Sequence, residues 1–126
     1  MIDVTFTIGS TDYHSLLSTY NVTHKVETRA SVVTMDGTEH YALQRRPVIT
    51  FSLIPLTDDQ TKSLYDLLSA GEVSVTYTDP YTYTAVTPSR TGVFRVASDL
   101  SSVFGVKSND RYYKGGEITL QQRTVL

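Results

Sequence analysis

Residues 26–47 read VETRASVVTMDGTEHYALQRRP, and this stretch decides the fold because a turn signal lies between two long segments that match as paired strands. Asp36 and Gly37 readily adopt the positive φ angles of a type I′ turn, so they can close a β-hairpin. A two-residue turn of this kind places Met35 opposite Thr38. The sequence therefore predicts a long hairpin as its best-supported element.

Counting outward from this turn predicts the two faces of the hairpin. One face is largely apolar, and its predicted cross-strand pairs are Val32 with Tyr41, Ala30 with Leu43, Thr28 with Arg45 and Val26 with Pro47. The opposite face pairs Arg29 with Gln44 and Glu27 with Arg46. The second of these is an opposite-charge pair, which contributes about 0.2–1 kcal/mol in a sheet. Because a slip of one residue would exchange the faces, the apolar face and the charge pair together support this register.

Composition sets the class of protein. A chain of 126 residues with 40% hydrophobic content suits a single domain, residues 1–126, with a core that needs no cross-links. The absence of cysteine excludes disulfides, thiolate metal sites and thiol nucleophiles. A net charge of −2 indicates no general attraction to nucleic acid or anionic lipid. Because no segment approaches the roughly 20 apolar residues that span a bilayer, we expect a soluble protein made without export, with neither nucleic acid nor membrane as a partner.

Alternating apolar residues predict further strands. Outside the hairpin, the predicted strands are residues 2–8, 49–53, 73–77, 93–97 and 118–122. Residues 81–87 are rich in tyrosine and threonine and predict an exposed arm or edge, whereas residues 98–111 are rich in turn formers. The sum is about seven strands, so the sequence predicts a mainly β protein.

One helix is expected near residues 58–70. Thr57 and Gln60 form a capping-box pattern, and Asp58 and Asp59 suit the positive end of the helix dipole. An apolar stripe at helical spacing is expected to pack on a sheet, and its members are Thr61, Leu64, Tyr65, Leu67 and Leu68.

No combination of residues points to catalysis or to a cofactor. His14, His24 and His40 share no spacing typical of metal ligands, and helix capping explains Asp58 and Asp59 more simply than acid-base chemistry does. We therefore predict no enzyme, no metal site and no cofactor.

The order of motifs resembles small tail proteins of bacteriophages and prophages over residues 22–80. The motifs are Thr-x-Asp-Gly, Arg-Arg-Pro-Val-Ile-Thr-Phe-Ser-Leu, Pro-Leu-Thr, a short leucine-rich helix and Val-x-Val-x-Tyr-x-Asp-Pro. The resemblance implies a β-sandwich or a partly closed barrel with one flanking helix, similar to tail-tube and distal-tail domains. It also implies a virion tail protein, made in the cytoplasm of a bacterial host, whose partners are copies of itself, for example in a ring, and other tail proteins. Residues 81–126 match no pattern of these proteins.

A long hairpin can project and offer its unpaired edge to another chain. The expected assembly contacts are Glu27, Arg29, Arg46, Tyr81 and Tyr83, although Glu27 and Arg46 could instead only satisfy each other. The alternative function is a carbohydrate- or peptide-binding β-sandwich module in which residues 77–83 form a stacking platform. The simpler interpretation of this segment is that Tyr77, Tyr81 and Tyr83 are ordinary strand residues.

Overall fold

The computed structural model describes residues 4–107 and 110–126, without the side chains at 29–31, 103–104, 106–107 and 110–111. It confirms a mainly β fold with one helix. The elements are β1 (Phe6–Ile8), β2 (Thr11–Asp12), a 3₁₀ turn (His14–Leu16), β3 (Leu17–Val33), β4 (Glu39–Leu53), α1 (Asp58–Leu68), β5 (Glu72–Tyr77), β6 (Arg90–Val96), β7 (Ser102–Lys107), β8 (Asp110–Gly115) and β9 (Ile118–Gln122).

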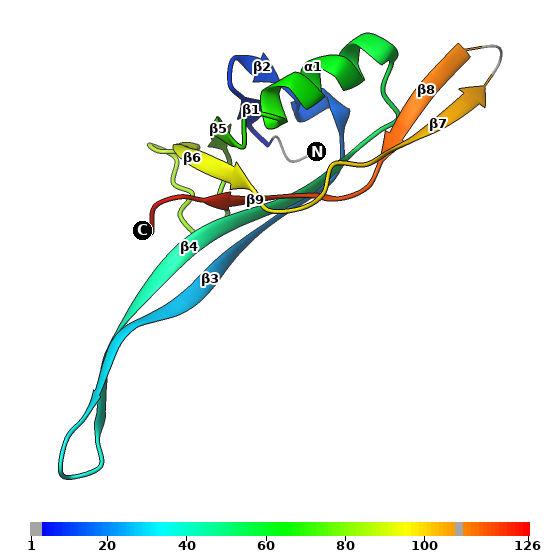
Figure 1. The fold of residues 1–126 in the computed structure, drawn as a ribbon. Coiled ribbons are helices and arrows are strands. Elements are labelled where there is room, and N and C mark those ends of the chain that lie inside the picture. Colours follow the sequence, from blue (N-terminus) through cyan, green and yellow to red (C-terminus); the bar gives the residue numbers. More distant parts are fainter. Residues whose placement is uncertain (1–3, 108–109) are drawn as a thin grey trace.

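The strands form one large sheet and one small sheet. Seven strands pair antiparallel in the order β2-β1-β5-β6-β9-β4-β3, and the sheet curls into a half-barrel, so the partly closed barrel describes the fold (Figure 1). Strands β7 and β8 form a separate hairpin, which is tied to the residues before α1 by two backbone hydrogen bonds between Leu56 and Tyr113. The helix contacts both β5 and β8.

The strand predictions outside the hairpin are mostly confirmed, with two corrections. Strands β5 and β9 cover the predicted positions, and β6 covers all but the last residue of the predicted strand 93–97. The first predicted strand is reduced to Phe6–Ile8, and residues 1–3 lie outside the described part. Residues 98–111 are not merely turns, because they contain β7 and the start of β8. Gly105 lies within β7, and glycine is disfavoured in strands, so the sequence gives little sign of this hairpin. In the structure the Tyr112 ring occupies the space beside Gly105 where a Cβ atom would clash.

The helix begins as predicted. The Thr57 hydroxyl accepts a hydrogen bond from the Gln60 backbone, and the Gln60 side chain accepts one from the Thr57 backbone, which completes the capping box. Leu64 and Leu68 are buried in the core. Tyr65 departs from the predicted stripe, because 54% of its surface remains exposed.

The long hairpin is confirmed, but its turn and register differ from the prediction. Thr34 and Thr38 pair through a backbone hydrogen bond of 2.9 Å, which leaves Met35, Asp36 and Gly37 as a three-residue loop. The Gly37 N–H donates to the Thr34 carbonyl, and Gly37 has a φ of 86°, the geometry of a type I turn followed by a glycine bulge. One extra loop residue shifts the register by one near the tip.

A second irregularity restores the predicted faces. The register shifts again between Arg29 and Ser31, so that Thr28 lies opposite Leu43 instead of Arg45, two residues from the predicted partner. Two shifts of one residue return each side chain to its original face. Between the turn and this second shift, the β3 side chains lie on the opposite face from the one predicted. Val33 lies opposite Glu39 there and takes the face that the prediction gave to Val32.

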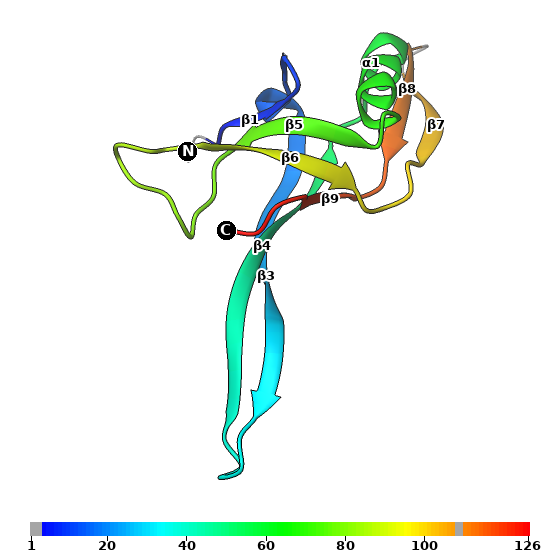
Figure 2. The ribbon, with the colours of Figure 1, turned by 60° about the vertical axis from the view of Figure 1, so that its left-hand side comes forward.

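The hydrophobic core lies entirely in the body of the molecule. Its buried members are Phe6, Ile8, Tyr13, Val22, Ile49, Phe51, Leu56, Leu64, Leu68, Val73, Val75, Tyr77, Phe94 and Leu120. Among the described side chains, no member comes from residues 23–46, and Figure 2 shows this part of the hairpin extending away from the body. Strand β4 keeps its pairing with β3 through Pro47, whereas β9 pairs with β4 only from Val48 to Phe51.

Candidate assembly surface

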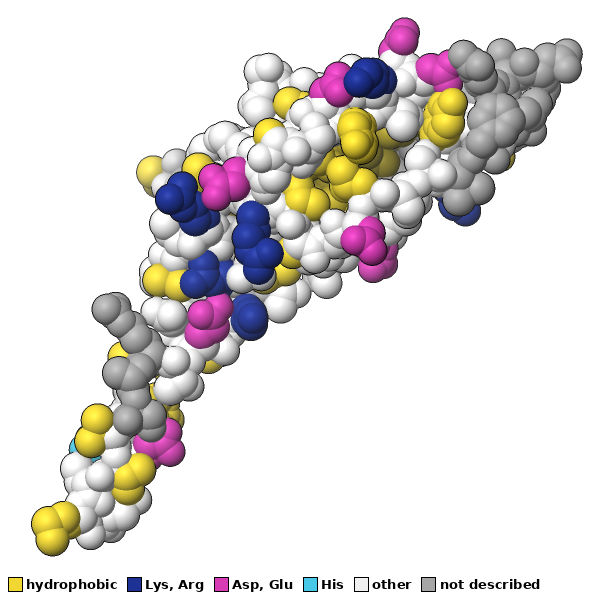
Figure 3. Space-filling model, viewed as in Figure 1, with side chains coloured by type: hydrophobic (Ala, Val, Ile, Leu, Met, Phe, Trp, Pro, Cys, Tyr) yellow, Lys and Arg dark blue, Asp and Glu magenta, His cyan; other side chains and the backbone are white. Residues whose placement is uncertain are grey.

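Residues 25–46, which we call the arm, project from the body as a two-stranded ribbon about 30 Å long at the usual rise of 3.3 Å per residue. Large apolar side chains along the arm are 54–65% exposed, and Met35 at its tip is fully exposed. These side chains are Val26, Val32, Val33, Met35, Tyr41 and Leu43. Scattered exposed apolar residues are normal on proteins, whereas a concentration on one projecting element is typical of a contact surface (Figure 3).

The tip is held in shape by polar contacts around Asp36. The Asp36 carboxylate accepts hydrogen bonds from the Thr34 hydroxyl and from the Thr38 backbone N–H, the latter at 3.0 Å. These bonds hold the pKa of Asp36 below its usual value, and the bond from Thr34 has the largest effect. Because the turn satisfies its own polar groups, Met35 can stay exposed on a defined loop.

A cluster around Arg46 joins the arm to the body. The Arg46 Nε atom donates to Glu27 Oε1 at 2.9 Å, and its Nη1 atom donates to the Gln122 and Arg123 carbonyls at 2.9 and 2.6 Å. Glu27 lies opposite Gln44, not Arg46, so the predicted direct pairing is wrong, and the ion pair forms diagonally on the same face. The hydrogen bond from Arg46 is the main reason that the pKa of Glu27 is lowered. Of these two predicted contact residues, Arg46 therefore links the arm to the body, and Glu27 contacts Arg46 within the arm.

A second anchor lies on the other face of the arm root. His24 on β3 forms a 2.6 Å contact between its Nε2 atom and Asp79 Oδ2, and Asp79 is buried. The other Asp79 oxygen accepts from the Tyr81 backbone N–H at 2.9 Å, and the Tyr81 ring lies 5.0 Å from the His24 ring. The sequence does not indicate this pair. The turn over Pro80 is a local signal, whereas His24 and Asp79 are 55 residues apart in the chain.

The predicted tyrosine surface is only partly present. Tyr81 and Tyr83 are exposed on the loop between β5 and β6, but Tyr77 is buried and packs edge-on against Phe94. Burial raises the pKa of Tyr77 to about 12. Tyr77 therefore cannot take part in a stacking platform. Arg29 lies in β3, and its side chain is outside the described part of the structure.

The arm also offers a sheet edge. Strand β3 is the last strand of the large sheet, and it extends over 17 residues from Leu17 to Val33. No described strand pairs with its outer edge. Such an edge presents backbone donors and acceptors to which another chain can add a strand.

Two other kinds of site are absent among the described residues. Among the described residues, no group of three or more His, Asp or Glu side chains is placed to hold a metal ion. Within the same residues, no helix has the length and apolar character needed to cross a membrane. Comparison of the chain with protein-family models, curated proteins and solved structures finds no match.

Proposed function

We propose that this chain is a non-enzymatic structural protein of a phage or prophage tail, which assembles with copies of itself and with other tail proteins through the arm and the β3 edge. The observation that carries the proposal is the arm, whose apolar side chains project beyond the core. The resemblance of residues 22–80 to phage tail proteins directs the proposal to a tail.

Energetics supports a partner for the arm. Ordering a residue in an extended strand costs about 1–2 kcal/mol of backbone entropy, and a lone two-stranded hairpin is marginally stable at best. The arm offsets little of this cost within its own chain, because it contributes no described side chain to the core. Covering a Val, Leu or Met side chain contributes about 1.5–3 kcal/mol, so a partner that buries the arm would supply the missing stabilisation.

The test is to shorten the arm without disturbing the body. Thr28 and Leu43 lie directly opposite each other, so residues 29–42 can be replaced by an Asn-Gly turn that joins these two positions. We expect a folded variant, because the deletion removes no described core residue. Light scattering over a concentration series is expected to show a discrete ring or concentration-dependent growth for the full chain and a monomer for the shortened chain.

A matched control separates the length of the arm from its apolar surface. Replacing Val33 and Tyr41 by threonine keeps the ribbon and removes two exposed apolar side chains, and we expect weaker assembly than in the full chain. Equal assembly by the full and shortened chains would contradict the proposal.

A carbohydrate- or peptide-binding module is the second candidate. A recess of about 400 Å³ beside the exposed Tyr81 ring favours it, because His24, Arg45 and Thr82 also line this recess. An aromatic face next to polar groups is typical of sugar recognition. Binding to a glycan array by a strictly monomeric protein would support this candidate over the tail protein.

A further inference from the structure

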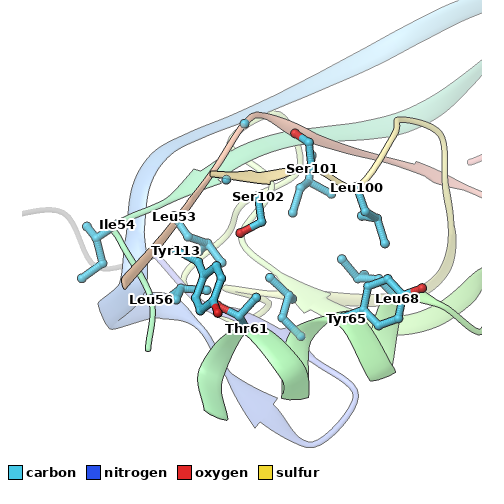
Figure 4. Close-up of a pocket in the computed structure, with 14 residues that line it drawn as sticks. Leu53, Ile54, Leu56, Thr61, Tyr65, Leu68, Leu100, Ser101, Ser102 and Tyr113 are labelled. Atoms are coloured by element: carbon cyan, nitrogen blue, oxygen red, sulfur yellow. The ribbon is translucent and has the colours of Figure 1, made fainter. Parts of the chain in front are cut away.

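An apolar groove lies on the body, away from the arm. It has a volume of about 260 Å³ and opens between α1, the β7–β8 hairpin and the neighbouring ends of β4 and β9 (Figure 4). Leucines from four segments line it, namely Leu53, Leu56, Leu64, Leu68 and Leu100. Tyr65 stands at one side, which explains why this residue of the helix stripe remains half exposed.

The lining indicates what the groove can hold. None of the lining residues is charged, and the volume lies just below the roughly 300–1,000 Å³ of pockets that take small ligands. Thr61 also lines the groove, but its hydroxyl oxygen is itself buried and offers no accessible polar group there. A polypeptide fits these features, because its apolar side chains can pack against the leucines.

The arm tip is the segment of this chain that matches. Met35 is fully exposed and flanked by Val32 and Val33, which are more than 60% exposed. In Figure 1 the arm points away from α1 and the β7–β8 hairpin, so the tip cannot reach the groove of its own chain. Only a second copy can bring the two surfaces together.

The size of the arm is adequate for such a contact. A stable interface buries about 800 Å² on each partner and takes about 20–30 residues from each side, and the arm offers roughly 20. The tip alone is too small, so the arm must lie against the body of the second copy behind the docked tip. This fixes a head-to-tail arrangement, which closes into a ring or continues as a chain according to its rotation.

We infer that the arm tip of one copy, led by Met35, occupies the apolar groove beside α1 of a second copy. The inference rests on the proposed function, since it names the surface that receives the arm. The two contact surfaces that it names, the arm tip and the groove, are different parts of the chain, so each can be tested separately.

The chain lacks cysteine, so introduced thiols report the contact without background. Met35→Cys and Tyr65→Cys variants are purified separately, mixed at micromolar concentration and oxidised. A docked tip raises the effective concentration of the two thiols toward the millimolar range, so we expect their mixed disulfide to form about 100 times faster than the control. The control mixes Met35→Cys with Thr91→Cys, which places a thiol at an exposed position of β6 outside the groove.

A chain that keeps the groove but has lost its own arm tests the direction of the contact. The shortened chain that carries Tyr65→Cys retains the groove, so we expect it to cross-link to full-length Met35→Cys and to give a covalent dimer. Cross-linking at the control rate would overturn the inference, as would faster disulfide formation between two Met35→Cys chains, which indicates contact between arm tips. If either result accompanies arm-dependent assembly in light scattering, the groove is wrong and the proposed function stands. If the full chain also stays monomeric, both fail.

Discussion

Replacing Arg46 by methionine is expected to loosen the arm from the body. Methionine retains much of the apolar stem of the side chain but none of its donors. In the structure those donors contact the Gln122 and Arg123 carbonyls and the Glu27 carboxylate, and only 19% of the Arg46 side chain is exposed. The variant therefore leaves the end of β9 without its link to the arm root.

The magnitude follows from the two carbonyl contacts. A hydrogen bond from a charged donor contributes about 1.5–3 kcal/mol, and water can replace part of it at this partly open site, so we expect a loss of about 2–4 kcal/mol in the free energy of unfolding. With a urea m-value of about 2 kcal/mol/M, the unfolding midpoint falls by roughly 1–2 M. Arg46→Lys keeps the charge but cannot reproduce the guanidinium fork, so its loss should be intermediate.

The assay is urea unfolding followed by circular dichroism, with hydrogen exchange as a local readout. We expect faster exchange of the amides at 22–27 and 44–48, where the arm meets the body, and little change in the core strand β5. A loss below about 1 kcal/mol, with unchanged exchange at the root, would refute the role of Arg46 as an anchor.

Two further predictions concern the body. Thr57→Ala removes the cap of α1 and should cost about 0.5–2 kcal/mol in urea unfolding, whereas Thr57→Ser should cost little, and an equal loss in both would contradict the capping role. Burial raises the pKa of Tyr20 and Tyr77, the latter to about 12, whereas both tyrosines ionise near pH 10 in the unfolded chain. The contribution of these tyrosines to the free energy of unfolding is therefore complete below about pH 10 and is lost as the pH rises through about 12. A titration followed by tyrosinate absorbance should show late, cooperative ionisation, and ionisation of all nine tyrosines near pH 10 in the folded protein would contradict it.

Local signals in the sequence located the elements well. The capping box at Thr57 and the turn at Asp36 are set by residues within four positions of each other, and both lie where the sequence predicts them. The error in the turn is also local. Asp-Gly suits both a two-residue and a three-residue loop, and the choice depends on whether Thr34 or Met35 forms the last strand pair.

Contacts between distant segments were beyond the sequence. The His24–Asp79 pair spans 55 residues, and the contact of Arg46 with Gln122 spans 76. The groove needs walls from α1, β4, β8 and β9 at once, so no local pattern indicates it. Composition and periodicity describe which side chains avoid water, but not which surfaces they meet.

The apolar face of the arm shows this difference most directly. Val26, Tyr41 and Leu43 belong to the face that the sequence predicts to be apolar, yet each is more than half exposed in the single chain. Alternation of this kind is typical of a strand with one buried face. If a second copy covers the arm, the sequence pattern and the structure agree without further assumptions. The amphipathic pattern is then a property of the assembly, and the single chain shows only the half of the interface that it contributes.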